Sequence, residues 1–102
     1  MNEDINKIYN FLGLAKKANK VLSGDQTCEK LIKSEKAKLV IVSIDASDNT
    51  KKKFTDLCNY RSVNKIFFGE KELLGKYTGK DIRSVLVITD MGFAKKILEM
   101  VG

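Results

Sequence analysis

The sequence predicts an α/β fold in which helices cover both faces of a central sheet. Two continuous apolar runs rich in β-branched residues, 39–44 and 84–89, are typical of strands that are buried on both faces. Segments with helical spacing of their apolar residues lie before, between and after these runs, and this alternation indicates a layered sandwich. A chain of 102 residues can bury one modest core, so we expect a single domain over residues 1–102.

The first two helices are predicted from apolar residues three and four positions apart, the spacing of one helical face. Asn19 should end the first helix, because asparagine tolerates left-handed backbone, and a very short strand follows at 21–22. Ser23 and Gln26 then fit a capping box, so we expect the second helix over 24–34. The residues expected to face the core are Ile5, Ile8, Tyr9, Leu12, Ala15, Cys28, Leu31 and Ile32.

Polar residues mark the starts of later helices. Ser47 or Asp48 can cap one helix, Asp90 can cap the last one, and Gly79 closes a short helix between them. The elements expected after the second helix are strand 39–44, helix 50–59, strand 65–68, helix 70–77, strand 84–89 and a final helix that ends near 101. Their core-facing residues should include Phe54, Leu57, Cys58, Phe93, Ala94, Ile97, Leu98 and Val101.

Charge and composition narrow the classes of function. Lys and Arg number 19 against 13 Asp and Glu, so the chain carries +6, which favours a polyanionic partner such as nucleic acid. The absence of histidine removes the commonest general base and most zinc sites. Cys28 and Cys58 form no CxxC motif, and we expect reduced core thiols in a cytoplasmic protein. No apolar run has the length of a membrane span, and no metal or cofactor is expected.

The positive charge is concentrated between residues 16 and 38. This segment holds seven lysines against three acidic residues, a net of +4, and it surrounds the start of the second helix. Backbone amides and the helix dipole at such a start favour phosphate, so nucleic-acid binding is favoured over a merely solvated face. The run Lys51-Lys52-Lys53, by contrast, is interpreted as a solvated face.

Two residues at this helix start have competing interpretations. Gly24 either is an ordinary turn residue before a helix or, because it has no side chain, lets a nucleotide approach the backbone closely. The amide of Gln26 either completes the capping box or reads a base edge with its adjacent donor and acceptor. One side chain cannot do both at once, and the sequence leaves the choice open.

Signals for catalysis are weak. The glycine of Ser23-Gly24-Asp25 does not belong to a GxxxxGK[ST] phosphate-binding loop. Asp45 follows a strand, as a phosphoacceptor aspartate does, but the strand at 21–22 lacks the further acidic residues that such a site needs. We therefore expect no enzyme and no catalytic residue.

Many short motifs, in order along almost the whole chain, resemble the L-seven-Ae (L7Ae) superfamily of ribosomal and kink-turn RNA-binding proteins, and within it the small bacterial branch called YlxQ. Singly these motifs are weak, but their order and spacing are specific. They are Phe11-Leu12-Gly13-Leu14-Ala15 with Lys20, Ser23-Gly24, Lys36-Ala37-Lys38-Leu39-Val40, Asp45-Ala46-Ser47, Asn49-Thr50-Lys51-Lys52-Lys53, Leu57-Cys58, Phe68-Gly69 and Leu73-Leu74-Gly75 with Gly79.

The resemblance implies a three-layer α/β/α sandwich with a four-stranded mixed sheet, and RNA binding at the start of the second helix. The family motif there is G-x-N-E-x-x-K; Gly24 and Lys30 match it, Gln26 replaces the Asn and Thr27 replaces the Glu. The loop before the last strand is the second contact region implied by the family. The RNA-binding residues expected from charge and resemblance together are Gly24, Gln26, Thr27, Lys30, Lys33, Ile82 and Arg83.

Three hypotheses follow for the function. The first is a small, non-catalytic, ribosomal-protein-like RNA-binding protein that is cytoplasmic, has no membrane partner and is a monomer when free. The second is a protein-interaction module of the same fold that has lost its RNA; the departures from the family motif at Gln26 and Thr27, of which Thr27 lacks a carboxylate for a guanine edge, favour this alternative. The third is a small phosphoacceptor domain built around Asp45.

Overall fold

The computed structural model describes residues 2–102, with side chains described from Asp4 onward. Helices and strands alternate along the chain in the predicted order. They are α1 (Asn2–Lys17), β1 (Val21–Ser23), α2 (Asp25–Lys33), β2 (Leu39–Val42), α3 (Asp48–Arg61), β3 (Lys65–Phe67), α4 (Lys71–Tyr77), β4 (Val85–Ile88) and α5 (Met91–Val101).

The four strands form one mixed sheet in the order β1-β4-β2-β3. The β2–β3 pair is parallel, whereas β4 runs antiparallel to both β1 and β2. Every residue of β2 and β4 is buried, as expected for the two runs without polar alternation. The predicted α/β fold with a four-stranded mixed sheet is therefore confirmed.

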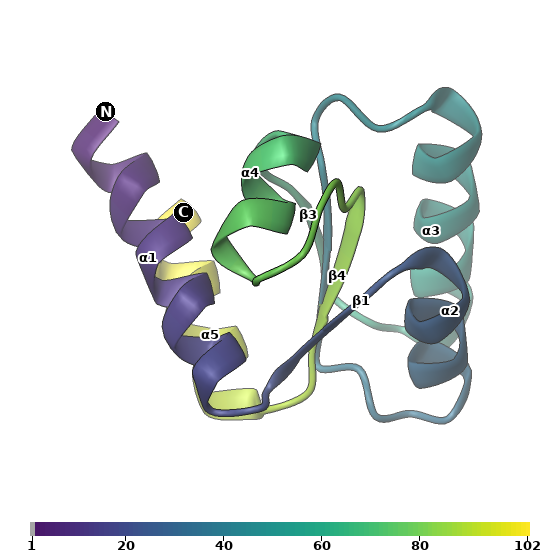
Figure 1. The fold of residues 1–102 in the computed structure, drawn as a ribbon. Helices are drawn as coiled ribbons and strands as arrows, with labels where there is room; N and C mark the ends of the chain where they lie inside the picture. Colours follow the sequence, from purple (N-terminus) through teal and green to yellow (C-terminus); the bar gives the residue numbers. More distant parts are fainter. Residues whose placement is uncertain (1) are drawn as a thin grey trace.

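The helices form a layer on each face of the sheet (Figure 1). Helices α2 and α3 pack on one face, where Cys28, Phe54 and Val40 share a core cluster. Helices α1, α4 and α5 pack on the other face around residues such as Leu12 and Ile41. Because successive side chains of a strand point to opposite faces, Val40 and Ile41 belong to different clusters, and the three-layer sandwich follows.

Most helix boundaries agree with the signals in the sequence. The Ser47 hydroxyl accepts a hydrogen bond from the Thr50 amide at 3.2 Å, so Ser47, rather than Asp48, caps α3. The Asp90 carboxylate accepts one from the Phe93 amide at 2.9 Å and caps α5. Asn19 adopts a left-handed conformation with φ 60° just after α1, as predicted.

Three apolar residues near the ends of the predicted elements were wrongly assigned, Ile44 to a strand and Ile5 and Val101 to the core; Phe67 lies in β3 as predicted but is exposed. Strand β2 stops at Val42, so Ile44 lies in the turn beyond the sheet and is 55% exposed. Ile5, Phe67 and Val101 are also exposed, at 46%, 46% and 38%, since they lie at the outer ends of α1, β3 and α5. All four residues line the same surface hollow.

The two cysteines are free thiols buried beneath α2 and α3, as predicted. Burial raises the pKa of Cys28 to about 12 and that of Cys58 to about 11. We expect both thiols to react slowly with an alkylating reagent in the native protein and rapidly after unfolding. Rapid native labelling of Cys28 would contradict the orientation of α2. Because burial raises both pKa values above the ordinary value of 9.0, the folded state favours the neutral thiols. The free energy of unfolding should therefore be unaffected by these groups below about pH 9 and should fall as the pH rises above it.

Candidate nucleic-acid interface

Helix α2 begins at a glycine and not at a capping box. Gly24 is the N-cap residue, with φ 98° and ψ 147°, a region that is almost restricted to glycine. Its amide donates to the Val85 carbonyl at 3.2 Å, which fixes the helix start against β4. No side chain caps α2, so the predicted capping box is wrong, and the first-turn amides remain available to an external acceptor.

Ser23 has a different partner, and this partner connects two parts of the predicted site. Arg83 Nε donates to Ser23 Oγ at 3.1 Å, and Arg83 Nη1 donates to the Ile82 carbonyl at 2.8 Å. Arg83 lies in the loop between α4 and β4, whereas Ser23 directly precedes the α2 N-cap. The structure therefore brings together the two regions that were predicted separately, and Ile82, 53% exposed, lies on the same loop.

The loop of residues 78–84 is held against α4 by backbone contacts. The Lys80 amide donates to the Gly75 carbonyl at 2.8 Å, and the Arg83 amide donates to the Lys71 carbonyl at 3.0 Å. A Cβ atom at Gly75 would overlap the carbonyl oxygen of Asp81. Sequence reasoning assigned no role to Gly75; the available signal was a glycine inside a short helix, a position that is unfavourable unless another segment approaches closely.

The outer face of α2 carries the remaining predicted residues. Gln26, Thr27, Lys30 and Lys33 are all exposed. Gln26, Lys30 and Lys33 line one shallow hollow together with Glu29. In the described part of the chain, the side chains of Gln26 and Lys30 make no hydrogen bond, so both are available to a ligand.

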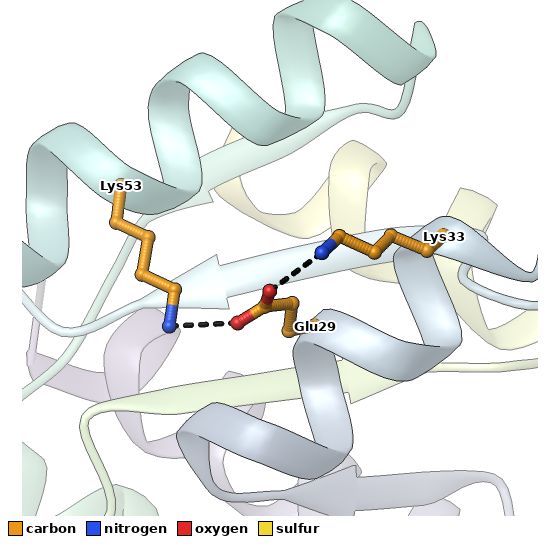
Figure 2. A network of polar contacts seen from close by, with 3 residues as sticks. All are labelled: Glu29, Lys33 and Lys53. Atoms are coloured by element: carbon orange, nitrogen blue, oxygen red, sulfur yellow. Dashed lines mark hydrogen bonds and ion pairs between the residues drawn. The ribbon is translucent and has the colours of Figure 1, made fainter.

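Glu29 lies between two lysines that come from different helices (Figure 2). Its Oε2 is 2.7 Å from Lys33 Nζ, and its Oε1 is 2.8 Å from Lys53 Nζ of α3. Hydrogen bonds from Lys33 and Lys53 lower the pKa of the Glu29 carboxyl to about 2, and the bond to Glu29 raises the pKa of Lys53. The predicted phosphate ligand Lys33 is thus already paired. Lys53 is not merely solvated, as its run of lysines had suggested, but links α3 to α2.

Asp45 has a structural partner that the sequence did not indicate. Its Oδ1 accepts a hydrogen bond from the Lys71 amide at 2.9 Å, so it fixes the start of α4. Desolvation raises the pKa of this carboxyl, but the bond from Lys71 and neighbouring interactions outweigh it, and the pKa is lowered. Among residues 4–102, whose side chains the structure describes, no cluster of three or more metal-ligating side chains is present to build a phosphoacceptor site around Asp45. In the same range, none of the helices is long and apolar enough to cross a membrane.

Comparison with known proteins identifies the family. The model of the ribosomal protein L7Ae/L30e/S12e/Gadd45 family matches residues 6–98. The RNA-binding protein YlxQ of Bacillus subtilis (strain 168) is 45% identical over 89 residues, which cover 87% of this chain and 89% of that protein. The RNA-binding protein YlxQ of Enterococcus faecium is 43% identical over 103 residues, which cover 99% of this chain and 98% of that protein.

Solved structures agree with this assignment. A protein of unknown function from Bacillus halodurans superposes with a TM-score of 0.89 at 34% identity, over 93% of this chain and 96% of that one. The Giardia lamblia 15.5kD RNA binding protein shares the fold, with a TM-score of 0.79 at 23% identity over 98% of this chain and 86% of that one. The family and these two relatives are named as ribosomal and RNA-binding proteins and not as enzymes. As its sequence motifs predicted, the chain belongs to the ribosomal protein L7Ae/L30e/S12e/Gadd45 family.

Proposed function

We propose that this protein binds structured RNA, without catalysis, through the N-terminus of α2 and the loop of residues 78–84. The observation that carries the proposal is the hydrogen bond from Arg83 to Ser23, which holds a cationic loop beside a helix start with no side-chain cap. Phosphate is favoured at such a start by the free amides and the helix dipole. The names of the two YlxQ relatives support the same class of ligand.

Each residue of the proposed site has a distinct role. Lys30 and Arg83 neutralise phosphates. Lys33 neutralises a further phosphate when its ion pair with Glu29 breaks. Gly24 lets the RNA backbone approach the helix, while Gln26 presents an amide to a base edge and Thr27 a hydroxyl. The exposed Ile82 packs against an unstacked nucleotide, as apolar and aromatic side chains do in RNA recognition.

The proposed RNA is a kink-turn or a related bent, non-helical motif, ribosomal or otherwise. Gln26 keeps the amide of the family motif, but Thr27 brings no carboxylate to a guanine edge. We therefore expect a preference for a kink-turn over a plain duplex that depends mainly on Gln26. The protein is proposed to act in the cytoplasm and to be a monomer when free.

Mobility-shift titrations with a kink-turn RNA and a plain duplex test the proposal. Lys30→Ala should weaken both RNAs alike and make the salt dependence of log K shallower by about one unit. Gln26→Ala should cost about 1–3 kcal/mol for the kink-turn and little for the duplex. Lys51→Ala is the control, since Lys51 belongs to α3 and not to α2 or the loop of residues 78–84, and it should change neither affinity. Failure of the wild-type protein to bind either RNA would favour the protein-interaction module instead.

The Glu29 network gives a second prediction for the same surface. Glu29→Gln removes the negative charge that holds Lys33 and Lys53, so both ammonium groups become available to phosphate. We expect RNA affinity to rise about two- to fivefold, with a steeper salt dependence. Asp56→Asn is the matched control, because it releases Lys52 in the same way but on the exposed side of α3. An equal gain in both variants would indicate a general charge effect and not a contact at the α2–α3 surface.

A further inference from the structure

The strongest feature outside the proposed RNA surface is a hollow on the other helical layer. It lies between the first turns of α1, the last turn of α5, the end of β3 and the start of α4, and its cavity volume is about 660 Å³. None of its lining residues belongs to the proposed RNA site. The sheet separates this α1/α4/α5 layer from α2, as Figure 1 shows.

Exposed apolar side chains gather around this hollow. Nine large hydrophobic residues are exposed in the described part of the chain, and four of them, Ile5, Ile44, Phe67 and Val101, line it. They come from four separate segments, so the fold and not one amphipathic helix assembles the patch. A contiguous apolar patch of this kind marks an interaction site more often than single exposed residues do.

The floor of the hollow is held together by packing and hydrogen bonds. Tyr9 packs against Phe68 with ring centroids 5.1 Å apart, and its hydroxyl accepts a hydrogen bond from the Glu70 amide at 3.0 Å. The Ile44 amide donates to the Gly69 carbonyl at 2.8 Å, which fixes the turn after β2 against the end of β3. A ligand therefore meets a surface whose backbone is already ordered, which lowers the entropic cost of binding.

The charge of the lining is opposite to that of the whole protein. Although the chain carries +6, the described lining residues include the carboxylates Asp4 and Glu70 and no lysine or arginine. Glu70 is the N-cap residue of α4, yet its carboxylate makes no capping hydrogen bond; the amide of the next residue, Lys71, donates to Asp45. One cation approaches the rim: Lys65 Nζ lies 4.2 Å from the Phe67 ring centroid, and it donates to Thr55 on the side of α3.

We propose that this hollow, the α1/α4 groove, docks a protein segment that carries apolar anchors next to lysine or arginine. The apolar patch supplies the anchoring contacts, and Glu70 selects the positive flank. A nucleic acid is disfavoured because the described lining includes the carboxylate Glu70 and no lysine or arginine. The proposal is independent of RNA binding, since it uses another helical layer and the opposite charge.

The test uses the full chain and two synthetic peptides, one with leucines between lysines and a twin with glutamate in place of each lysine. By NMR titration, the basic peptide should shift the amide resonances of Ile44, Gly69 and Glu70, and should bind at least about fivefold more tightly than the acidic twin. The net charge of the protein alone predicts the reverse order, so equal or tighter binding of the acidic twin overturns the proposal. No shift of the groove resonances overturns it as well.

Two pairs of matched variants test whether the basic peptide binds in the groove. Ile44→Asp should abolish binding of the basic peptide, whereas Leu14→Asp should not; the two residues are 55% and 56% exposed, but Leu14 does not line the groove. Glu70→Lys should weaken the peptide about fivefold or more, while Glu72→Lys, with the same charge change in α4, should leave it unchanged. Equal effects within either pair would overturn the proposal. So would sedimentation showing a dimer that Ile44→Asp dissolves, because a second copy would then be the occupant.

Discussion

A Gly75→Ala variant should lose both stability and RNA affinity. The added methyl group would overlap the Asp81 carbonyl, a backbone atom that cannot rotate away, so the loop of residues 78–84 must move off α4. We expect a loss of about 1–3 kcal/mol in the free energy of unfolding. The displacement also moves Arg83 away from Ser23, so RNA affinity should fall about tenfold or more even where the protein is folded. Urea denaturation and mobility shift measure the two effects.

Gly92→Ala is the control for this prediction. It makes the same substitution inside a helix, but its nearest neighbour is a side-chain oxygen at 3.1 Å, the Asp90 carboxylate that caps α5. This oxygen has to move only slightly, so we expect the cap to be kept. We expect stability and RNA affinity close to those of the wild type. A Gly75→Ala protein as stable as Gly92→Ala would contradict the close packing of the loop on α4.

A Gly24→Val variant should show the largest loss of RNA binding among folded variants. A Cβ at Gly24 meets no protein atom within 4 Å, so the side chain would project into open space at the helix start, where the RNA backbone is proposed to lie. We expect RNA affinity to fall about a hundredfold, close to 3 kcal/mol. Fluorescence anisotropy with the kink-turn RNA measures this change.

Backbone strain has to be separated from obstruction in this experiment. The φ of 98° at Gly24 costs any other residue about 1–3 kcal/mol, and Gly24→Ala bears this cost as well. Obstruction of the RNA predicts that the valine variant binds much more weakly than the alanine variant, at similar stability. Similar RNA affinity of the two variants would attribute the loss to a distorted helix start, and unchanged affinity in both would place the RNA elsewhere.

The sequence was sufficient for the architecture because hydrophobic spacing reports it directly. The runs around Val40 and Val87 lacked polar alternation, and both became strands buried on two faces. The ends of elements were less predictable. Ile44 continues the apolar run of β2, but the strand ends where its neighbours end, and this depends on pairing with distant segments. Periodicity alone therefore predicted a strand that extends to residue 44, and the exposure of Ile44 in the groove was not predicted.

The sequence predicted which segments form the candidate site, but not which of their residues contact one another. Charge and the family motif indicated the start of α2 and the loop with Arg83. The bond between Arg83 and Ser23 joins residues far apart in the chain, and the local capping rule assigned Ser23 to a nearer partner. The pairing of Lys53 with Glu29 likewise depends on how α3 lies beside α2. Such contacts are set by tertiary packing, which one sequence does not report.

The position of β4 in the sheet has a consequence for synthesis on the ribosome. This strand lies between β1 and β2 and is the partner of β1, but it follows β1, β2 and β3 along the chain. A nascent chain that ends before residue 85 can form the local parallel unit of β2 and β3, while β1 has no strand to pair with. The complete sheet therefore cannot form until residues 85–88 have been synthesised, which makes its folding a non-local event. Chains released early expose unpaired strand edges, and they should be prone to aggregation and degradation.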